Sequence, residues 1–281
     1  MIFIGTLKQY FRNHPMAFFG FLLVAALIVA ALGASWIAPY DPNLQSLNDR
    51  LLPPSFHHWM GTDQYGRDVF SRLVYASRIS LAVGIVAVTI YVLIGTTVGS
   101  VAGFYGGWVD GILMRLVDIL LSIPTFLLIL IVIAFVGPSI FNIMVIIGLT
   151  SWTDVARLVR GEVLSLKERE FILAAKVVGM KNSRIILKHL LPNAMGPVLV
   201  VSTLGVGGAI LIESALSYLG LGVQPPTASW GNMLMEGKEH LTDAWWLVTF
   251  PGLAVFLTVL GYNLLGEGLR DFWDPRLRGS R

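Results

Sequence analysis

The stretch ISLAVGIVAVTIYVLIGTTVGSVAGF, residues 79–104, decides the fold class of this 281-residue chain. It contains no Asp, Glu, Lys, Arg or His. A helix of this length is about 39 Å long, which exceeds the hydrocarbon thickness of a bilayer, about 30 Å. We therefore predict that this segment crosses a membrane as one helix.

Five further apolar runs of comparable length predict that the chain crosses the membrane six times in all. Glu213 is the one ionisable side chain well inside any of them, whereas Asp118 and Asp154 lie at the edges of two runs. The first run is too long for the apolar part of a signal peptide, which is about 7 to 15 residues. The five runs are residues 16–38, 117–137, 138–156, 197–221 and 244–266.

The composition agrees with an all-α membrane protein. Only 13% of the residues are charged, about half the roughly 25% of soluble domains, and 55% are hydrophobic. The mean hydropathy of +0.73 indicates that the lipid bilayer solvates much of the exterior. The absence of cysteine excludes disulfides, thiolate zinc sites and thiol nucleophiles.

The distribution of charge predicts the orientation of the chain. We expect a cytoplasmic N-terminal segment (1–15), a first transmembrane helix with an extracytoplasmic loop (16–78), and a core of five helices (79–281) with a long cytoplasmic loop (157–196). With both termini in the cytoplasm, 15 of the 20 basic residues lie inside and five outside, as the positive-inside rule requires.

The long loop, residues 157–196, is predicted to fold as two short helices. Apolar side chains recur at helical spacing before Gly179, which breaks the pattern, and a second helical stretch follows and ends at Pro192. The basic residues of such a hairpin can contact anionic lipid headgroups, and the same surface can instead dock a soluble partner. The residue pattern alone leaves both interpretations open.

Two parts of this loop resemble a known motif. The sequence LAAKVVG (173–179), followed by HLLP (189–192), is similar to the cytoplasmic EAA loop of bacterial ABC importer permeases. Leu173 stands where that family usually has Glu, and His189 where it usually has Ile.

Four further groups of segments, in order along nearly the whole chain, resemble the C-type permease subunit of the dipeptide, oligopeptide and nickel branch of this family. They are APYDP (38–42) with GTD (61–63) and GRDVFSRL (66–73), YGGWVD (105–110) with MR (114–115) and Asp118, QPP (224–226) through WG (230–231), and GLRD (268–271) with DPRL (274–277).

The resemblance implies a subunit of a type I ABC importer in the bacterial inner membrane. Its partners would be a B-type permease, two cytosolic ATPases that bind ATP and Mg²⁺, and an extracytoplasmic solute-binding protein. This chain would be a pore subunit, not an enzyme, with no cofactor or metal of its own and no nucleic acid partner. In agreement, the sequence contains no phosphate-binding loop of the G-x-x-x-x-G-K-[ST] type.

The resemblance also implies that the loop couples this chain to an ATPase. Small residues at its centre would sit deepest in a groove of the ATPase, and charged residues would form the rim. The predicted coupling residues are Arg169, Glu170, Ala174, Ala175, Lys176, Gly179, Met180 and Lys181.

Two features inside the spans stand out. Gly95, Gly99 and Gly103 repeat every fourth residue and predict a face for close helix packing. Glu213 is a candidate for the translocation path, because an intramembrane carboxylate needs water or a partner. It either meets the amino group of a peptide substrate or pairs with a polar group of the neighbouring permease.

Charged residues near the ends of the spans are predicted to be structural. Arg115 and Asp118 are spaced to pair along one helix face. Asp63, Arg67, Asp68 and Arg72 either brace the helix ends or clasp the binding protein, and we favour the brace. A soft-metal site at His57, His58 and Met60 is disfavoured, because adjacent histidines on a proline-rich loop rarely act as ligands.

Three alternatives to the peptide importer make different demands on the sequence. The same architecture could import nickel chelates or short glycosides. An intramembrane hydrolase would need Ser202, Ser214 or Ser217 beside a histidine, yet His189 and His240 are predicted on opposite sides of the membrane. A secondary transporter would normally carry several ionisable groups at mid-membrane.

Overall fold

The computed structural model describes residues 14–273, the side chains of the last two excepted. Within this range the fold is helical, with one isolated bridge between Thr62 and Asp68 and no β-strand. The DPRL motif (274–277) and most of the predicted N-terminal segment (1–15) lie outside the described residues. The helices are α2 (Pro15–Leu32), α3 (Ala34–Ile37), α4 (Val69–Tyr105), α5 (Gly107–Leu121), α6 (Thr125–Val136), α7 (Ile140–Thr150), α8 (Trp152–Leu166), α9 (Glu170–Val177), α10 (Asn182–Ile185), α11 (Leu191–Tyr218), α12 (Trp230–Gly237) and α13 (Trp246–Trp273).

The described residues contain five helical segments long and apolar enough to cross a membrane, or six if the bent pair α5 and α6 counts as one span. The prediction of one straight helix over 117–137 is wrong. α5 begins at Gly107 and ends at Leu121, and α6 begins at Thr125 after a bend of 82°. Pro124 lies at the bend, where it supplies no N–H and disfavours helical backbone in the residue before it.

Other helix boundaries also differ from the prediction. α4 begins at Val69, ten residues early, because the Asp68 carboxylate accepts a hydrogen bond from the backbone N–H of Ser71 at 2.8 Å and caps the helix. The predicted boundary between residues 78 and 79 therefore lies inside α4. The fourth run continues past Ala156 to the end of α8 at Leu166, after a short break at Ser151.

The second helix of the loop does not end at Pro192. α10, a π-helical turn (Ile186–Leu190) and α11 form one continuous helical segment from Asn182 to Tyr218. Pro192 lies in the first turn of α11, where its missing N–H breaks no hydrogen bond of that helix. The hairpin is consequently continuous with a membrane span.

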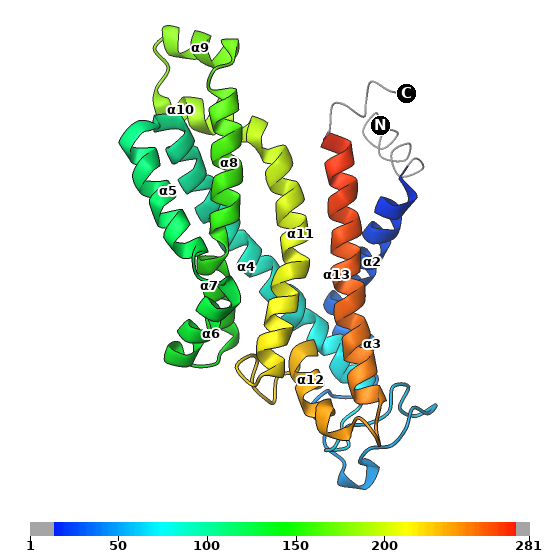
Figure 1. Ribbon diagram of the computed structural model, residues 1–281. Helices are drawn as coiled ribbons and strands as arrows, with labels where there is room; N and C mark the ends of the chain where they lie inside the picture. Colours follow the sequence, from blue (N-terminus) through cyan, green and yellow to red (C-terminus); the bar gives the residue numbers. More distant parts are fainter. Residues whose placement is uncertain (1–13, 274–281) are drawn as a thin grey trace.

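The helices form an elongated bundle around α4 (Figure 1). α4 packs against α8, α11, α7 and α2, and α13 packs against α11 and α2. α9 and α10 lie at one end of the bundle, the end at which α2 begins and α13 finishes (Figure 1). α12 and the segment 38–68 lie at the opposite end.

The contact between α4 and α8 depends on the predicted glycine face. A Cβ added at Gly95 would lie 2.6 Å from the Cβ of Val155, and one at Gly103 would lie 3.0 Å from the Cβ of Val163. At Gly99 it would collide with the carbonyl oxygen of Ala156. The prediction of close helix packing at these glycines is confirmed, and the partner helix belongs to the same chain.

We expect Gly99→Ala to lower the free energy of unfolding by about 1–3 kcal/mol, because the added methyl group overpacks the α4–α8 contact. Gly161→Ala on α8 is the matched control, since a Cβ there meets no atom within 4 Å. It should be neutral or stabilising by up to about 1 kcal/mol, the helix preference of alanine over glycine. Equal unfolding curves in detergent for the two variants would contradict the assignment.

Candidate functional site

The α9–α10 hairpin turns at Gly179, whose φ of +78° is in the left-handed region. Its N–H donates to the Lys176 carbonyl at 3.0 Å, and the N–H of Met180 donates to the Ala175 carbonyl at 3.1 Å. A Cβ at Gly179 would meet no atom within 4 Å, so backbone conformation, not space, requires glycine here.

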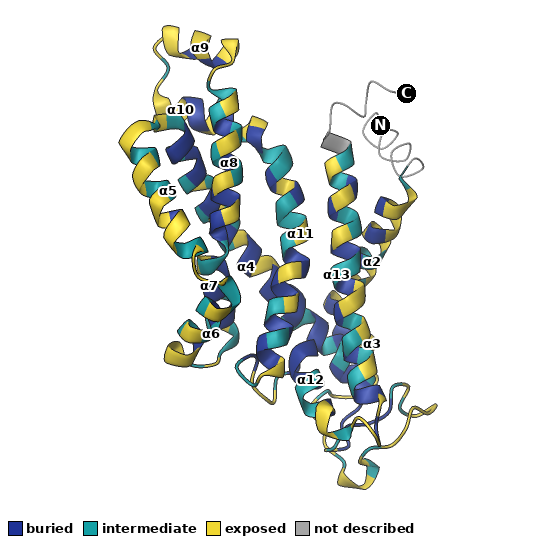
Figure 2. Ribbon diagram, in the orientation of Figure 1, coloured by how far each residue is buried: buried dark blue, intermediate teal, exposed yellow. Residues whose placement is uncertain are grey.

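The hairpin exposes large apolar side chains. Val177 and Val178 are 87% and 83% exposed, and Leu187 is 64% exposed. Val178 and Leu187 border a groove of about 620 Å³ that basic residues such as Lys181 also line. Much of the α9 surface is exposed in Figure 2. An apolar surface rimmed by charge is typical of a contact site for another protein or a membrane.

The predicted coupling residues divide into two groups. Arg169, Glu170, Ala174, Lys176, Gly179 and Lys181 are exposed, and Met180 is half-buried. Ala175, predicted to lie deepest in the ATPase groove, is instead buried in the chain's own core. The sequence reading missed Val177 and Val178, because apolar residues at the end of an amphipathic helix resemble its buried face.

An open cavity of about 340 Å³ lies between four helices of the bundle. α4, α7, α8 and α11 supply its walls. The lining residues are Tyr91, Ile147, Ser151, Asp154, Val155, Val201, Leu204, Gly205, Gly208, Ala209 and Ile212.

Asp154 is the one charged residue among those described as lining this cavity, and its side chain is exposed. The structure gives that side chain no hydrogen bond or ion pair with any residue of 14–273. Gly205 provides room for Tyr91, since a Cβ at Gly205 would collide with the Tyr91 hydroxyl oxygen. At Gly208 a Cβ would meet nothing within 4 Å, so the cavity is open there.

Glu213 does not face this cavity. It is fully buried, and its carboxylate accepts hydrogen bonds from the hydroxyls of Ser217 at 2.7 Å and Ser80 at 3.3 Å. Both predicted partners, a peptide amino group and a polar group of a second permease, are therefore replaced by serines of this chain. Sequence reasoning placed Asp154 at the edge of a span because that span was taken to end at Ala156.

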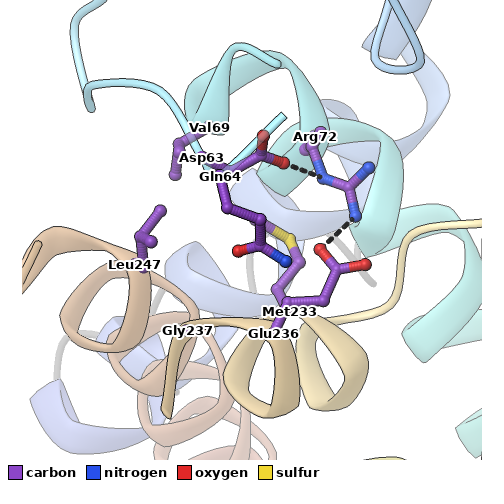
Figure 3. A pocket seen from close by; sticks show the side chains of 8 residues that line it. All are labelled: Asp63, Gln64, Val69, Arg72, Met233, Glu236, Gly237 and Leu247. Carbon is purple, nitrogen blue, oxygen red and sulfur yellow. Dashed lines mark hydrogen bonds and ion pairs between the residues drawn. The ribbon is translucent and has the colours of Figure 1, made fainter. Parts of the chain in front are cut away.

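A buried ion network lies at the other end of the bundle (Figure 3). Glu236 on α12 accepts hydrogen bonds from Arg67 at 2.7 Å and Arg72 at 3.0 Å. Arg67 also donates to Asp63 at 2.6 Å, and the Arg72 Nε lies 3.6 Å from the same carboxylate oxygen. These residues pair within the chain, as the favoured prediction of a brace expects. Glu236, 164 residues from Arg72, was missed.

His58 and Asp68 extend this region. The His58 Nδ1 lies 2.9 Å from an Asp68 oxygen, while the other Asp68 oxygen caps α4. Within residues 14–273, no group of three or more His, Asp or Glu side chains is placed to hold a metal ion.

Two ion pairs join α5 to α8. Asp118 pairs with Arg157 at 2.6 Å and not with the predicted Arg115, and both side chains are about half exposed. Arg160 donates two hydrogen bonds to Asp110, at 2.5 and 2.6 Å. A pair between two helices holds them together, which a pair along one helix face cannot do.

Comparisons with known proteins agree over most of the chain. Residues 95–279 match the family described as binding-protein-dependent transport system inner membrane component. Residues 7–54 match the N-terminal transmembrane domain of oligopeptide transport permease C.

The chain is similar to several permeases whose names state a substrate. The dipeptide transport system permease protein DppC of Alkalihalophilus pseudofirmus is 43% identical over 95% of this chain and 88% of its own length. The oligopeptide transport system permease protein OppC of Bacillus subtilis is 42% identical over 95% of this chain and 88% of its own length. The glutathione transport system permease protein GsiD of Escherichia coli is 44% identical over 96% and 89%.

We expect Glu236→Gln to lower the free energy of unfolding by about 3–5 kcal/mol, because it leaves two buried arginines with one carboxylate between them. Glu239→Gln, three residues along and exposed, is the matched control and should change stability by less than about 0.5 kcal/mol. Unfolding in detergent checks both. A Glu236 variant as stable as the control would show that the network is not a brace.

Proposed function

The chain belongs to the family of binding-protein-dependent transport system inner membrane components, and on this premise we propose that it is one of two pore-forming permeases of an ATP-driven importer of di- and oligopeptides. The second permease is a B-type subunit, two cytosolic ATPases bind ATP and Mg²⁺, and an extracytoplasmic binding protein delivers the solute. The two permeases span the bacterial inner membrane.

The observation that carries this proposal is that the hairpin connects two helices that line the cavity. α8 leads into the hairpin, and α10 continues into α11 as one helical segment. α8 supplies Asp154 to the cavity, and α11 supplies Gly205 and Gly208. A displacement of the hairpin by an ATPase therefore acts directly on the helices that line the cavity.

We assign the hairpin end of the bundle to the cytoplasm. The excess of basic residues in and around the hairpin favours this side. The exposed Val177 and Val178, with Gly179, Lys181 and the groove beside them, then form the surface for the ATPase. Ala175 supports this surface from within.

Peptides are the solute class that the relatives' names support, since dipeptide, oligopeptide and glutathione permeases are all about equally similar to this chain. An uptake assay with a panel of solutes would distinguish peptides from nickel chelates and short glycosides. The intramembrane hydrolase has no support, because this family is a transport component and the hydroxyls of Ser214 and Ser217 face Glu213 and not a histidine.

A single thiol should locate the ATPase. The chain has no cysteine, so Val178→Cys introduces its one reactive thiol at an exposed position. In the assembled importer we expect a bifunctional reagent to join this thiol to an ATPase subunit. Thr242→Cys, exposed at the opposite end of the bundle, is the control and should not crosslink to the ATPase. Crosslinking from Thr242 alone would reverse the assigned orientation.

In proteoliposomes with the complete importer, we expect ATP-dependent uptake of a dipeptide, and Gly179→Asp should reduce it at least tenfold because the turn needs a left-handed backbone. Ser165→Asp, which adds the same charge at an exposed site on α8, should retain uptake within twofold. Assembly is checked by co-purification. Peptide uptake by this chain reconstituted alone would contradict the proposal.

A further inference from the structure

Asp154 lies near the middle of a helical segment that is long and apolar enough to cross a membrane. The span Ile140–Leu166 has 27 residues, and at about 1.5 Å per residue Asp154 is about 20 Å from either end. A carboxylate at this depth is costly in contact with lipid and requires water or a cation. Its exposed side chain therefore faces a water-filled space or another molecule.

Among residues 14–273, no cation pairs with this carboxylate. The two nearest arginines along α8, Arg157 and Arg160, are occupied by Asp118 and Asp110. No basic residue lines the cavity within the described part of the chain. In contrast, serine hydroxyls donate hydrogen bonds to the carboxyl group of Glu213. Asp154 is thus the intramembrane carboxylate left for an external partner.

The cavity around Asp154 has the composition of a ligand site. Its polar groups are the Asp154 carboxylate and the hydroxyls of Tyr91 and Ser151, and most of the remaining wall is apolar or glycine backbone. Its volume of about 340 Å³ is far more than one water molecule needs. A few converging polar groups on an apolar wall are typical of small-molecule sites.

We propose that Asp154 binds the α-ammonium group of a peptide that passes through this cavity. The inference rests on the proposed function and names the residue that receives the substrate. The carboxylate accepts a charge-assisted hydrogen bond from the ammonium group. The peptide's side chains lie against the apolar wall of α11, where Gly208 leaves room. Contact with one carboxylate is weak enough for release, which conduction requires.

Two other roles for Asp154 give different results. As an acidic residue in the first turn of α8 it would stabilise the helix N-terminus, and its neutralisation would lower stability and leave transport per ATP unchanged. As the partner of a cation on the second permease it would hold the two subunits together, and its neutralisation would lower the yield of the complex.

The test uses the complete importer in proteoliposomes, with radiolabelled alanylalanine and its binding protein. We expect Asp154→Asn to retain binding-protein-stimulated ATPase activity within twofold and to reduce peptide uptake per ATP at least tenfold, and Asp154→Glu to restore it. Gly208→Phe, which fills the cavity without changing charge, should reduce uptake similarly. Glu162→Gln on the same helix is the matched control and should match wild type.

A cysteine variant keeps the test decisive if Asp154→Asn does not assemble. Asp154→Cys, in a complex freed of other cysteines, should react with water-soluble methanethiosulfonates. A sulfonatoethyl group restores the negative charge and should restore uptake at least fivefold, whereas an aminoethyl group should not. Failure of the thiol to react, or equal uptake with both groups, would overturn the proposal.

The outcomes separate this inference from the proposed function. If the wild-type importer takes up no peptide, the proposed function fails and the inference fails with it. If the wild type takes up peptide and Asp154→Asn does so within twofold per ATP, only the inference is wrong. A loss of stability or of complex yield with unchanged uptake per ATP assigns Asp154 to one of the two structural roles.

Discussion

The close contact between α4 and α8 is the constraint on which the other features depend. Gly95, Gly99 and Gly103 let the two backbones approach, and no larger residue fits opposite Val155 and Ala156. α4 carries Tyr91 into the cavity and begins at the ion network around Glu236, whereas α8 carries Asp154 and leads into the hairpin. In a membrane, where lipid is as apolar as the side chains, close backbone packing is a main source of helix association.

The acidic residues of the chain have different partners at different positions along the bundle. At the end of the bundle that contains α12, Asp63, Arg67, Arg72 and Glu236 pair with one another, which joins α4 to α12. Towards the hairpin, Asp110 and Asp118 pair with arginines of α8 and hold α5 to it. Glu213 is enclosed by serines, and Asp154 is the charged residue among the described residues that line the cavity.

The sequence predicted what depends on local pattern and missed what depends on distant residues. Five spans, the hairpin turn at Gly179 and the glycine face of α4 follow from apolar length, one glycine and a four-residue repeat. The brace was predicted without Glu236, because no local pattern links residues so far apart in sequence. For a related reason, Glu213 was predicted for the translocation path and Asp154 was placed only at the edge of a span. Both are isolated acids, and only packing shows that serines surround one while the other remains exposed.

The arrangement of the hairpin also bears on how a weak site could release its ligand. Asp154 lies on α8 and the glycines opposite lie on α11, so the two sides of the proposed ammonium site belong to the two helices that the hairpin connects. A rigid displacement of the hairpin shifts one wall against the other, and the affinity for the peptide then differs between the two states. A motor can only drive transport through a site whose affinity changes with state. Placing the carboxylate and the apolar wall on separate helices satisfies that requirement with no additional moving part.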